Sequence, residues 1–243
     1  MRFTPALASG VLVQRYKRFL ADIRLPDGTL KTIHCPNTGS MKNCASPGDR
    51  AWYSTSGNPA RKYPDTWELN ETQAGDFIGV NTQRANGLVQ AAIEQGVMPA
   101  LLGYSSIKGE VKYGAQNSRI DLLLTGHSSQ ADCYVEVKSV TLCETVGACP
   151  VGYFPDSVSR RGTKHLHELM AVVAQGQRGV LVFCVQHSAI TEVRPALHID
   201  PVYTQALALA LARGVEVLAY GATLSPLGVT LDKALPVSMA ELL

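Results

Sequence analysis

Three charged residues interrupt two successive apolar stretches of this chain, SRIDLLL and CYVEVKSV. Asp121 lies in the first stretch, and Glu136 and Lys138 lie two positions apart in the second. Because strand side chains alternate between faces, Glu136 and Lys138 share one face. If the stretches pair as an antiparallel hairpin, Asp121 lies beside Glu136. The pattern therefore predicts two carboxylates and an ammonium group at one place.

This set of groups has a chemical use. Two carboxylates can hold a hard divalent cation such as Mg²⁺, which prefers oxygen ligands and keeps several waters. A lysine beside them can orient or deprotonate a water, as phosphodiester hydrolysis requires. A plain ion pair between Glu136 and Lys138 explains the same residues, because D…ExK is a loose pattern. Both interpretations stay open at this point.

A helix is predicted from about Ser157 to Gly176, with Pro155 and Asp156 as its start signals. Arg161, His165 and Glu168 follow at helical spacing on one side, so a helix packed beside the carboxylate strands would direct them at the same site. His165 could then hydrogen-bond a metal-bound water or a phosphate. The alternative is an amphipathic helix whose charged face is solvated.

The N-terminal part predicts a small antiparallel barrel, because short strands alternate with turn signals. Residues 10–33 are expected to form one hairpin around Pro26-Asp27-Gly28, with Val11, Val13, Phe19, Ala21 and Ile23 on one side. Basic and aromatic residues of this part are candidates for binding nucleic acid, although charged faces usually serve solubility. The candidates are Lys17, Arg18, Arg61, Lys62 and Tyr63.

After Asp76 the apolar period changes from strand-like to helical, in NTQRANGLVQAAIEQGV. The predicted order is then helix, three strands, helix, strand, helix, strand. We expect one domain over residues 1–80 and a second, of α/β class, over residues 81–243.

Seven segments of the chain resemble the sugar fermentation stimulation protein A family of bacteria and archaea. They are QRYKRFLADI, HCPNTGSM, YSTSGNPARKYPDTWEL, NSRID, YVEVKSVTL, GYFPD and RGTKHLHEL. The resemblance implies an OB-like β-barrel that binds nucleic acid, followed by an α/β domain of the PD-(D/E)xK nuclease type with a mixed central sheet. The fold expected for the whole chain is therefore α/β, or α+β overall.

The resemblance also implies roles for residues. Asp121 and Glu136 are expected to bind Mg²⁺ or Mn²⁺, with Glu110 completing the set as the early acid of that superfamily. Catalytic roles are expected for Asp121, Glu136, Lys138 and His165, and a nucleic-acid contact for Arg161. Ile120 stands where the motif often has proline.

Two functions follow from the resemblance. The first is a nonspecific DNA-binding protein with a nuclease-like metal site and a regulatory role in sugar (maltose) metabolism. The alternative is an active divalent-metal-dependent nuclease that acts on DNA or RNA.

Composition adds few constraints. A net charge of +2 does not by itself indicate nucleic-acid binding. The six cysteines show no CxxC pair or zinc spacing, and no apolar stretch is long enough for a membrane span, so we expect reduced cysteines and a cytoplasmic location. No glycine-rich phosphate loop is present, and no nucleotide cofactor is predicted.

Overall fold

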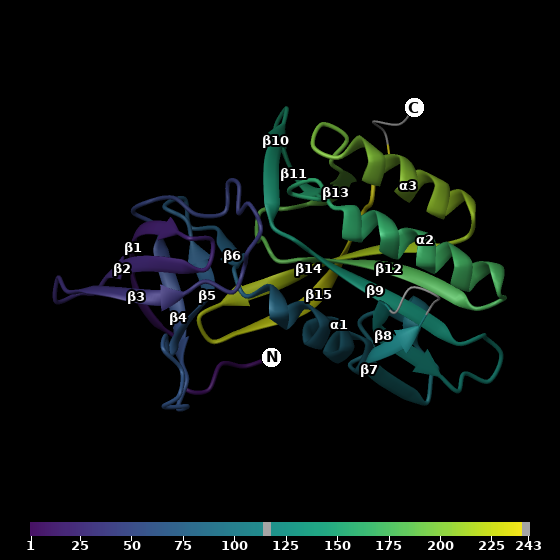
Figure 1. The fold of residues 1–243 in the computed structure, drawn as a ribbon, viewed down its shortest axis with the longest axis horizontal. Helices are drawn as coiled ribbons and strands as arrows, with labels where there is room; N and C mark the ends of the chain where they lie inside the picture. Colours follow the sequence, from purple (N-terminus) through teal and green to yellow (C-terminus); the bar gives the residue numbers. More distant parts are fainter. Residues whose placement is uncertain (114–117, 240–243) are drawn as a thin grey trace.

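Five short strands of the N-terminal part close into a barrel, in the order β3-β2-β1-β4-β5 (Figure 1). Closure comes from a parallel pairing of His34 with Thr66, and the short strand β6 extends the sheet beyond β5. The strands are β1 (Ala8–Tyr16), β2 (Leu20–Arg24), β3 (Leu30–His34), β4 (Arg50–Thr55), β5 (Asp65–Glu71) and β6 (Phe77–Gly79). The computed structural model describes residues 1–113 and 118–239. The expected OB-like barrel is confirmed.

The first predicted hairpin is wrong in detail, because residues 8–34 form three strands. Lys17 and Arg18 adopt left-handed backbone angles (φ 49° and 65°) and make an additional tight turn after β1. Val11 and Phe19 are 47% and 44% exposed, whereas Leu12 is buried. Ala21 and Ile23 are buried, so the five residues do not share one side: this turn and a register shift after Leu12 reset the alternation of faces.

The C-terminal part is built on a mixed sheet of six strands, in the order β15-β14-β12-β9-β8-β7. β9 lies inside this sheet, antiparallel to β8 and parallel to β12. The strands are β7 (Ser106–Tyr113), β8 (Ser118–Thr125), β9 (Cys133–Val140), β12 (Arg178–Val185), β14 (Glu216–Ser225) and β15 (Gly228–Leu235). A smaller sheet, β10-β11-β13, consists of β10 (Leu142–Val146), β11 (Cys149–Phe154) and β13 (Glu192–Pro195).

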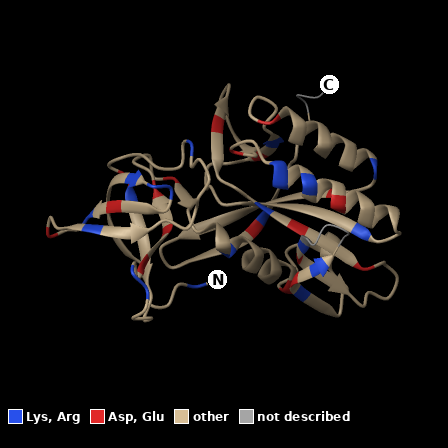
Figure 2. Ribbon diagram, viewed as in Figure 1, with Lys and Arg blue, Asp and Glu red and all other residues tan. Residues whose placement is uncertain are grey.

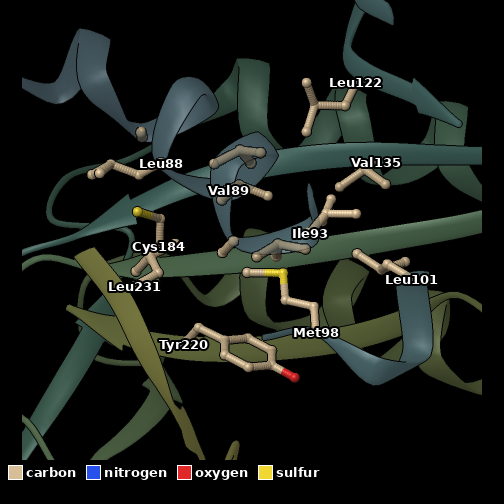
Figure 3. Packing of buried hydrophobic residues seen from close by; sticks show 14 of the residues in the cluster. Leu88, Val89, Ile93, Met98, Leu101, Leu122, Val135, Cys184, Tyr220 and Leu231 are labelled. Atoms are coloured by element: carbon tan, nitrogen blue, oxygen red, sulfur yellow. The ribbon is translucent and has the colours of Figure 1, made fainter. Parts of the chain in front are cut away.

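Helices cover both faces of the six-stranded sheet (Figure 1). α1 (Ala85–Glu94) packs on one face, where Leu88, Val89 and Ile93 meet Leu122 and Val135 (Figure 3). α2 (Arg160–Ala174) and α3 (Pro201–Ala212) pack on the other. Short 3₁₀ turns at Thr82–Arg84 and Pro99–Leu101 flank α1. Each buried Leu or Ile side chain contributes about 1.5–3 kcal/mol, so this packing fixes β8 and β9 between two helical layers.

α2 begins later than its sequence signals indicated. Ser159 is its N-cap, and the Ser159 hydroxyl accepts a hydrogen bond from Gly162 N at 3.0 Å. The backbone N–H of Ser159 donates in turn to Asp200 Oδ2, at 2.7 Å. Asp200 also caps α3, by accepting from Tyr203 N at 3.0 Å. One carboxylate therefore ties the starts of both helices together.

Hydrogen bonds join the barrel to the C-terminal part and bring two distant sequence segments together. Ser40, in the PNTGS turn, donates from its backbone N and from its hydroxyl to Asp156 Oδ2, at 3.1 and 3.0 Å. Gly79 N donates to Gln186 O at 2.8 Å. The segment HCPNTGSM of the barrel therefore lies against GYFPD, which ends β11.

All six cysteines are free thiols. Burial raises the pKa of Cys44 to about 11 and of Cys184 to about 12, so these thiols stay protonated at neutral pH and pack as apolar groups. Within residues 1–113 and 118–239, no helix is long and apolar enough to cross a membrane.

Candidate metal and phosphodiester site

Asp121 occupies the position where the β8–β9 pairing ends. The printed register runs from Leu124↔Cys133 to Leu122↔Val135, so Asp121 and Glu136 are the next residues on the two strands. There the Asp121 carboxylate takes the place of a backbone acceptor. Its Oδ2 accepts a hydrogen bond from the backbone N–H of Val137 at 2.7 Å. The antiparallel pairing predicted for these strands therefore brings Asp121 beside Glu136.

Asn86 of α1 holds the other oxygen of Asp121. Its Nδ2 donates to Asp121 Oδ1 at 2.9 Å and lies 3.4 Å from Glu110 Oε1. Glu110 is exposed and has a left-handed backbone (φ 55°) in β7. The amide thus links the two acids on neighbouring strands. Sequence reasoning missed Asn86, since no spacing pattern relates it to Asp121 thirty-five residues later.

Glu136 is 2% exposed and forms the centre of a buried charged cluster. Its Oε1 accepts from Lys138 Nζ at 2.6 Å and contacts His165 Nδ1 of α2. Arg161 Nε donates to His165 Nε2 at 3.3 Å. Since Nε2 accepts, Nδ1 carries the proton and donates to Glu136. The structure brings Glu136, Lys138, His165 and Arg161 together.

The predicted solvated face of α2 is therefore wrong for two residues. His165 and Glu168 are 5% and 7% exposed, whereas Arg161 is exposed. The helical spacing correctly grouped all three residues on one side. On that side of α2, His165 and Glu168 face the sheet, and Arg161 faces water.

The two carboxylates differ in electrostatic environment. Burial raises the pKa of Asp121, and the nearby Glu136 charge raises it further, against hydrogen bonds from Val137 and Asn86. Burial would also raise the pKa of Glu136, but His165 and Lys138 outweigh it and hold that pKa below its usual value. Glu136 is therefore ionised at neutral pH, and its charge opposes ionisation of Asp121.

One buried oxygen of this cluster, Glu136 Oε2, lacks a hydrogen-bond partner. The buried carboxylate of Glu168 lies beside the Tyr113 hydroxyl, and Lys164 lies 4.0 Å from it. Buried acceptors are normally satisfied, so the unpaired oxygen of Glu136 is a position for a further donor or a cation.

The donor set fits a hard divalent cation that keeps much of its water. Asp121 and Glu136 Oε2 could supply oxygen ligands, and the Asn86 amide that donates to Asp121 also lies near Glu110. Among residues 1–113 and 118–239, no three His, Cys, Asp or Glu side chains already converge as a metal site.

The candidate nucleic-acid residues lie in three places. Lys17 and Arg18 are exposed at the β1–β2 turn, and Arg61 and Lys62 are exposed in the β4–β5 loop. In that loop the Lys62 ammonium lies 5.6 Å from the centroid of the Tyr63 ring. Arg161, in contrast, lies beside the carboxylates on α2. Basic and acidic residues are interspersed along both parts of the ribbon (Figure 2).

Two family models and several curated proteins match the sequence of this chain. The SfsA N-terminal OB domain matches residues 13–80, and the sugar fermentation stimulation protein RE domain matches residues 83–228. Curated proteins from Shewanella piezotolerans and Shewanella frigidimarina, both named sugar fermentation stimulation protein homolog, are each 58% identical over 239 residues. Each match covers 98% of this chain and 100% of the relative.

A solved structure is similar over almost the whole fold. It is that of Pyrococcus furiosus SfsA in complex with Ca²⁺, with a TM-score of 0.84, 26% sequence identity and 98% of each chain covered. The matched domains together span most of this chain, and the curated relatives match it from end to end. The chain therefore belongs to the sugar fermentation stimulation protein family.

Proposed function

We propose that this chain binds nucleic acid and hydrolyses phosphodiester bonds with the help of a divalent cation. The observation that carries this proposal is the arrangement at the end of β8 and β9. Asp121 and Glu136 lie on adjacent strands, one buried oxygen of Glu136 lacks a partner, and Lys138 is beside them. A structural ion pair between Glu136 and Lys138 leaves that oxygen of Glu136 without a partner.

Asp121 and Glu136 are the residues that would hold the cation, with Glu110 as an outer ligand. A divalent cation supplies positive charge to a phosphate under attack and lowers the pKa of a bound water. The Pyrococcus furiosus relative was solved with Ca²⁺, which uses the same oxygen ligands as Mg²⁺. We infer that Mg²⁺ or Mn²⁺ is the ion used in catalysis.

The protein groups around the carboxylates have separable tasks. Lys138 carries a positive charge on the face of β9 where the phosphate would approach, and its ammonium can donate a proton or orient a water. His165 fixes the carboxylate of Glu136 through Nδ1–H. Arg161 is exposed next to His165 and is free on its outer side to contact a phosphate oxygen.

A second candidate function is nucleic-acid binding without cleavage, in which the nuclease-like part is a scaffold and the outcome is regulatory. One observation favours it: Lys138 and His165 both occupy Glu136 Oε1, so the ion pair is satisfied without a cation. In this candidate, DNA is held by the barrel and its basic loops.

Labelled single- and double-stranded DNA and RNA, incubated with the purified protein and either Mg²⁺, Mn²⁺ or EDTA, separate the two candidates. We expect cleavage that requires metal and is lost in Lys138→Ala, while Lys42→Ala, an exposed lysine paired with Glu144, retains it. Binding of the same substrates with no cleavage under any metal condition would leave the scaffold function.

A further inference from the structure

Two basic side chains lie opposite each other where β7 and β8 pair, close to the carboxylates. The register of the two strands runs from Ser106↔Thr125 to Tyr113↔Ser118 and places Lys112 directly opposite Arg119. Both side chains are exposed. Within residues 1–113 and 118–239, neither of these two charges forms a hydrogen bond or an ion pair within 4.0 Å. Lys112 and Arg119 are called the basic pair below.

The requirements of the sheet do not explain the basic pair. Like charges directly opposite each other on neighbouring strands repel and destabilise the sheet. β7 is an edge strand, and charges on edge strands prevent aggregation. Lys112 alone serves that purpose, because Arg119 belongs to β8, which lies inside the sheet. An anion that both side chains bind explains why a second cation stands opposite the first.

The basic pair lies on the face of the sheet that carries α1. Val111, Tyr113 and Ile120 pack in the core on the α2 side of the sheet. Since successive side chains of a strand point to opposite faces, Lys112 and Arg119, the neighbours of these residues, point to the α1 side.

On this face the basic pair is adjacent to the carboxylate site. Arg119 precedes Asp121 by two residues in β8, which corresponds to about 7 Å along a strand. Lys112 follows Glu110 by two residues in β7. Asn86, in the first turn of α1, donates to Asp121 at 2.9 Å and lies 3.4 Å from Glu110, so both acids also reach the α1 side. Along each strand, a cation therefore stands two residues from an acid.

A phosphate of a nucleic-acid strand is the anion that suits this position. A guanidinium and an ammonium group form charge-assisted hydrogen bonds with phosphate oxygens. In the proposed function, the phosphate under attack lies at Asp121 and Glu136. The next phosphate of the same strand is one nucleotide away, a separation similar to that between Asp121 and Arg119 along β8.

We infer that the basic pair binds the phosphate next to the one under attack. This inference rests on the proposed function, which places the phosphate under attack at the carboxylates. The basic pair would position a strand over Asp121 and would make the chain prefer a polynucleotide to an isolated diester. Because the contact is with phosphate, it is independent of base sequence.

Binding is tested with the full chain in EDTA, so that cleavage does not interfere. Fluorescence anisotropy measures the affinity for single-stranded DNA over a series of salt concentrations. Lys112→Gln combined with Arg119→Gln should weaken binding by about tenfold, the value of one hydrogen bond to a charged group. The same variant should lower the salt slope by about 0.7, as expected for one phosphate.

A matched control removes the same charge elsewhere. Arg213→Gln combined with Lys233→Gln changes two exposed residues, at the end of α3 and in β15, and should keep the affinity and the salt slope near wild type. Arg119→Lys keeps the charge and should keep the slope. The double variant of the basic pair loses a repulsion, so without ligand it should melt no lower than wild type. If it does not fold, Lys112→Gln and Arg119→Gln are compared singly.

Kinetics with Mn²⁺ test where the bound phosphate lies. Bis(4-nitrophenyl) phosphate carries a single phosphate, so the double variant of the basic pair should hydrolyse it as wild type does. For an oligonucleotide, the same variant should raise KM by about tenfold and leave kcat nearly unchanged. An equal loss on both substrates would overturn the inference, since the basic pair would then act on the phosphate under attack.

The failures are distinguishable. Unchanged affinity in the double variant of the basic pair, or an equal loss in the control with Arg213 and Lys233 replaced, would overturn the inference and leave the proposed hydrolysis untouched. A loss confined to Lys112 and Arg119, in a chain that cleaves nothing with any metal, would keep the phosphate site and refute the proposed hydrolysis. A wild-type chain that binds no oligonucleotide would overturn both.

Discussion

At the scale of the residue, the main feature of the site is that only a few groups neutralise the Glu136 carboxylate. Lys138 and His165 share one oxygen of that carboxylate, and the other oxygen has no partner. The convergence of Asp121, Glu136 and Lys138 could be predicted from sequence, because alternation along a strand and pairing within a hairpin are local properties. Asn86 could not, since only the packing of α1 on the sheet brings its amide to Asp121.

Lys138→Ala should destabilise the metal-free protein, because it leaves the buried Glu136 carboxylate without its lysine partner, with only the hydrogen bond from His165 on Oε1. Breaking a buried pair by removing one partner costs about 3–5 kcal/mol, and the Lys138 side chain is 14% exposed. Lys42→Ala is the matched control: that lysine is 53% exposed and should cost less than about 1 kcal/mol. Urea unfolding of both variants measures the difference, and equal losses would contradict the buried pair.

Asp121→Asn should have an effect on stability that depends on pH. The folded pKa of Asp121 is raised, so its contribution to stability is present below the ordinary aspartate pKa and is lost as pH rises through the folded pKa. In EDTA, the variant should therefore gain stability relative to wild type as pH rises from acid to neutral. Chemical unfolding at several pH values tests this, and an effect of the opposite sign would refute the assigned environment.

Glu136 should contribute in the opposite sense. Its folded pKa is lowered, so its contribution is present above the ordinary glutamate pKa and is lost as pH falls through the folded pKa. Glu136→Gln should therefore cost most at neutral pH and progressively less in acid. The same unfolding series compares the two variants, and a cost independent of pH would show that Glu136 is not charged in the folded state.

At the scale of the element, the β4–β5 loop combines two exposed basic residues, Arg61 and Lys62, with the Tyr63 ring. Replacing Arg61, Lys62 and Tyr63 together by alanine should weaken binding of single-stranded nucleic acid by about tenfold or more, since two phosphate contacts and a stacking surface are lost. Asp121→Asn, in EDTA, should leave affinity nearly unchanged. Anisotropy titrations compare the two variants, and the reverse ranking would place binding at the carboxylate site.

Element types were largely predictable, whereas boundaries and one sheet were not. The apolar stripe of α2 predicts a helix, but its start is set by Ser159 and Asp200, which lie forty-one residues apart. The sheet β10-β11-β13 escaped prediction because β11 and β13 pair in parallel across an intervening helix and strand. The sequence of β5 did carry an overlooked signal. Glu68 is a charged residue inside an otherwise buried strand, and it forms an ion pair with Arg84.

At the scale of the whole molecule, the net charge is only +2, and basic and acidic residues are interspersed. This limits the number of phosphates that the chain could contact at one time. We expect few phosphate contacts and no base-specific recognition helix, so affinity should fall with salt with a slope of about 0.7 for each phosphate neutralised on a single strand. Titrations over a series of salt concentrations measure that slope. A single preferred sequence bound with little salt dependence would contradict nonspecific binding.

The segment between the barrel and α1 also connects the two parts of the chain. Asn81, Gln83 and Arg84 line a cavity of the barrel, and their segment leads directly into α1, whose Asn86 holds Asp121. In the proposed function, the barrel would hold a strand while β8 and β9 present the carboxylates. A binding part and a hydrolytic site would then lie in one chain of 243 residues.

The central claim, that Asp121 and Glu136 form a divalent-cation site, is tested most directly by thermal unfolding of wild type and Asp121→Asn with Mg²⁺, Mn²⁺ or EDTA. A cation at about 100 times its Kd stabilises a fold by about 2.7 kcal/mol, or roughly 5–10 °C in a chain of this size. We predict such a rise for wild type, smaller at acid pH where protons compete for the carboxylates, and absent in Asp121→Asn. Asp232→Asn, an exposed control, should retain it. Melting of wild type that is the same with metal and with EDTA would contradict the account.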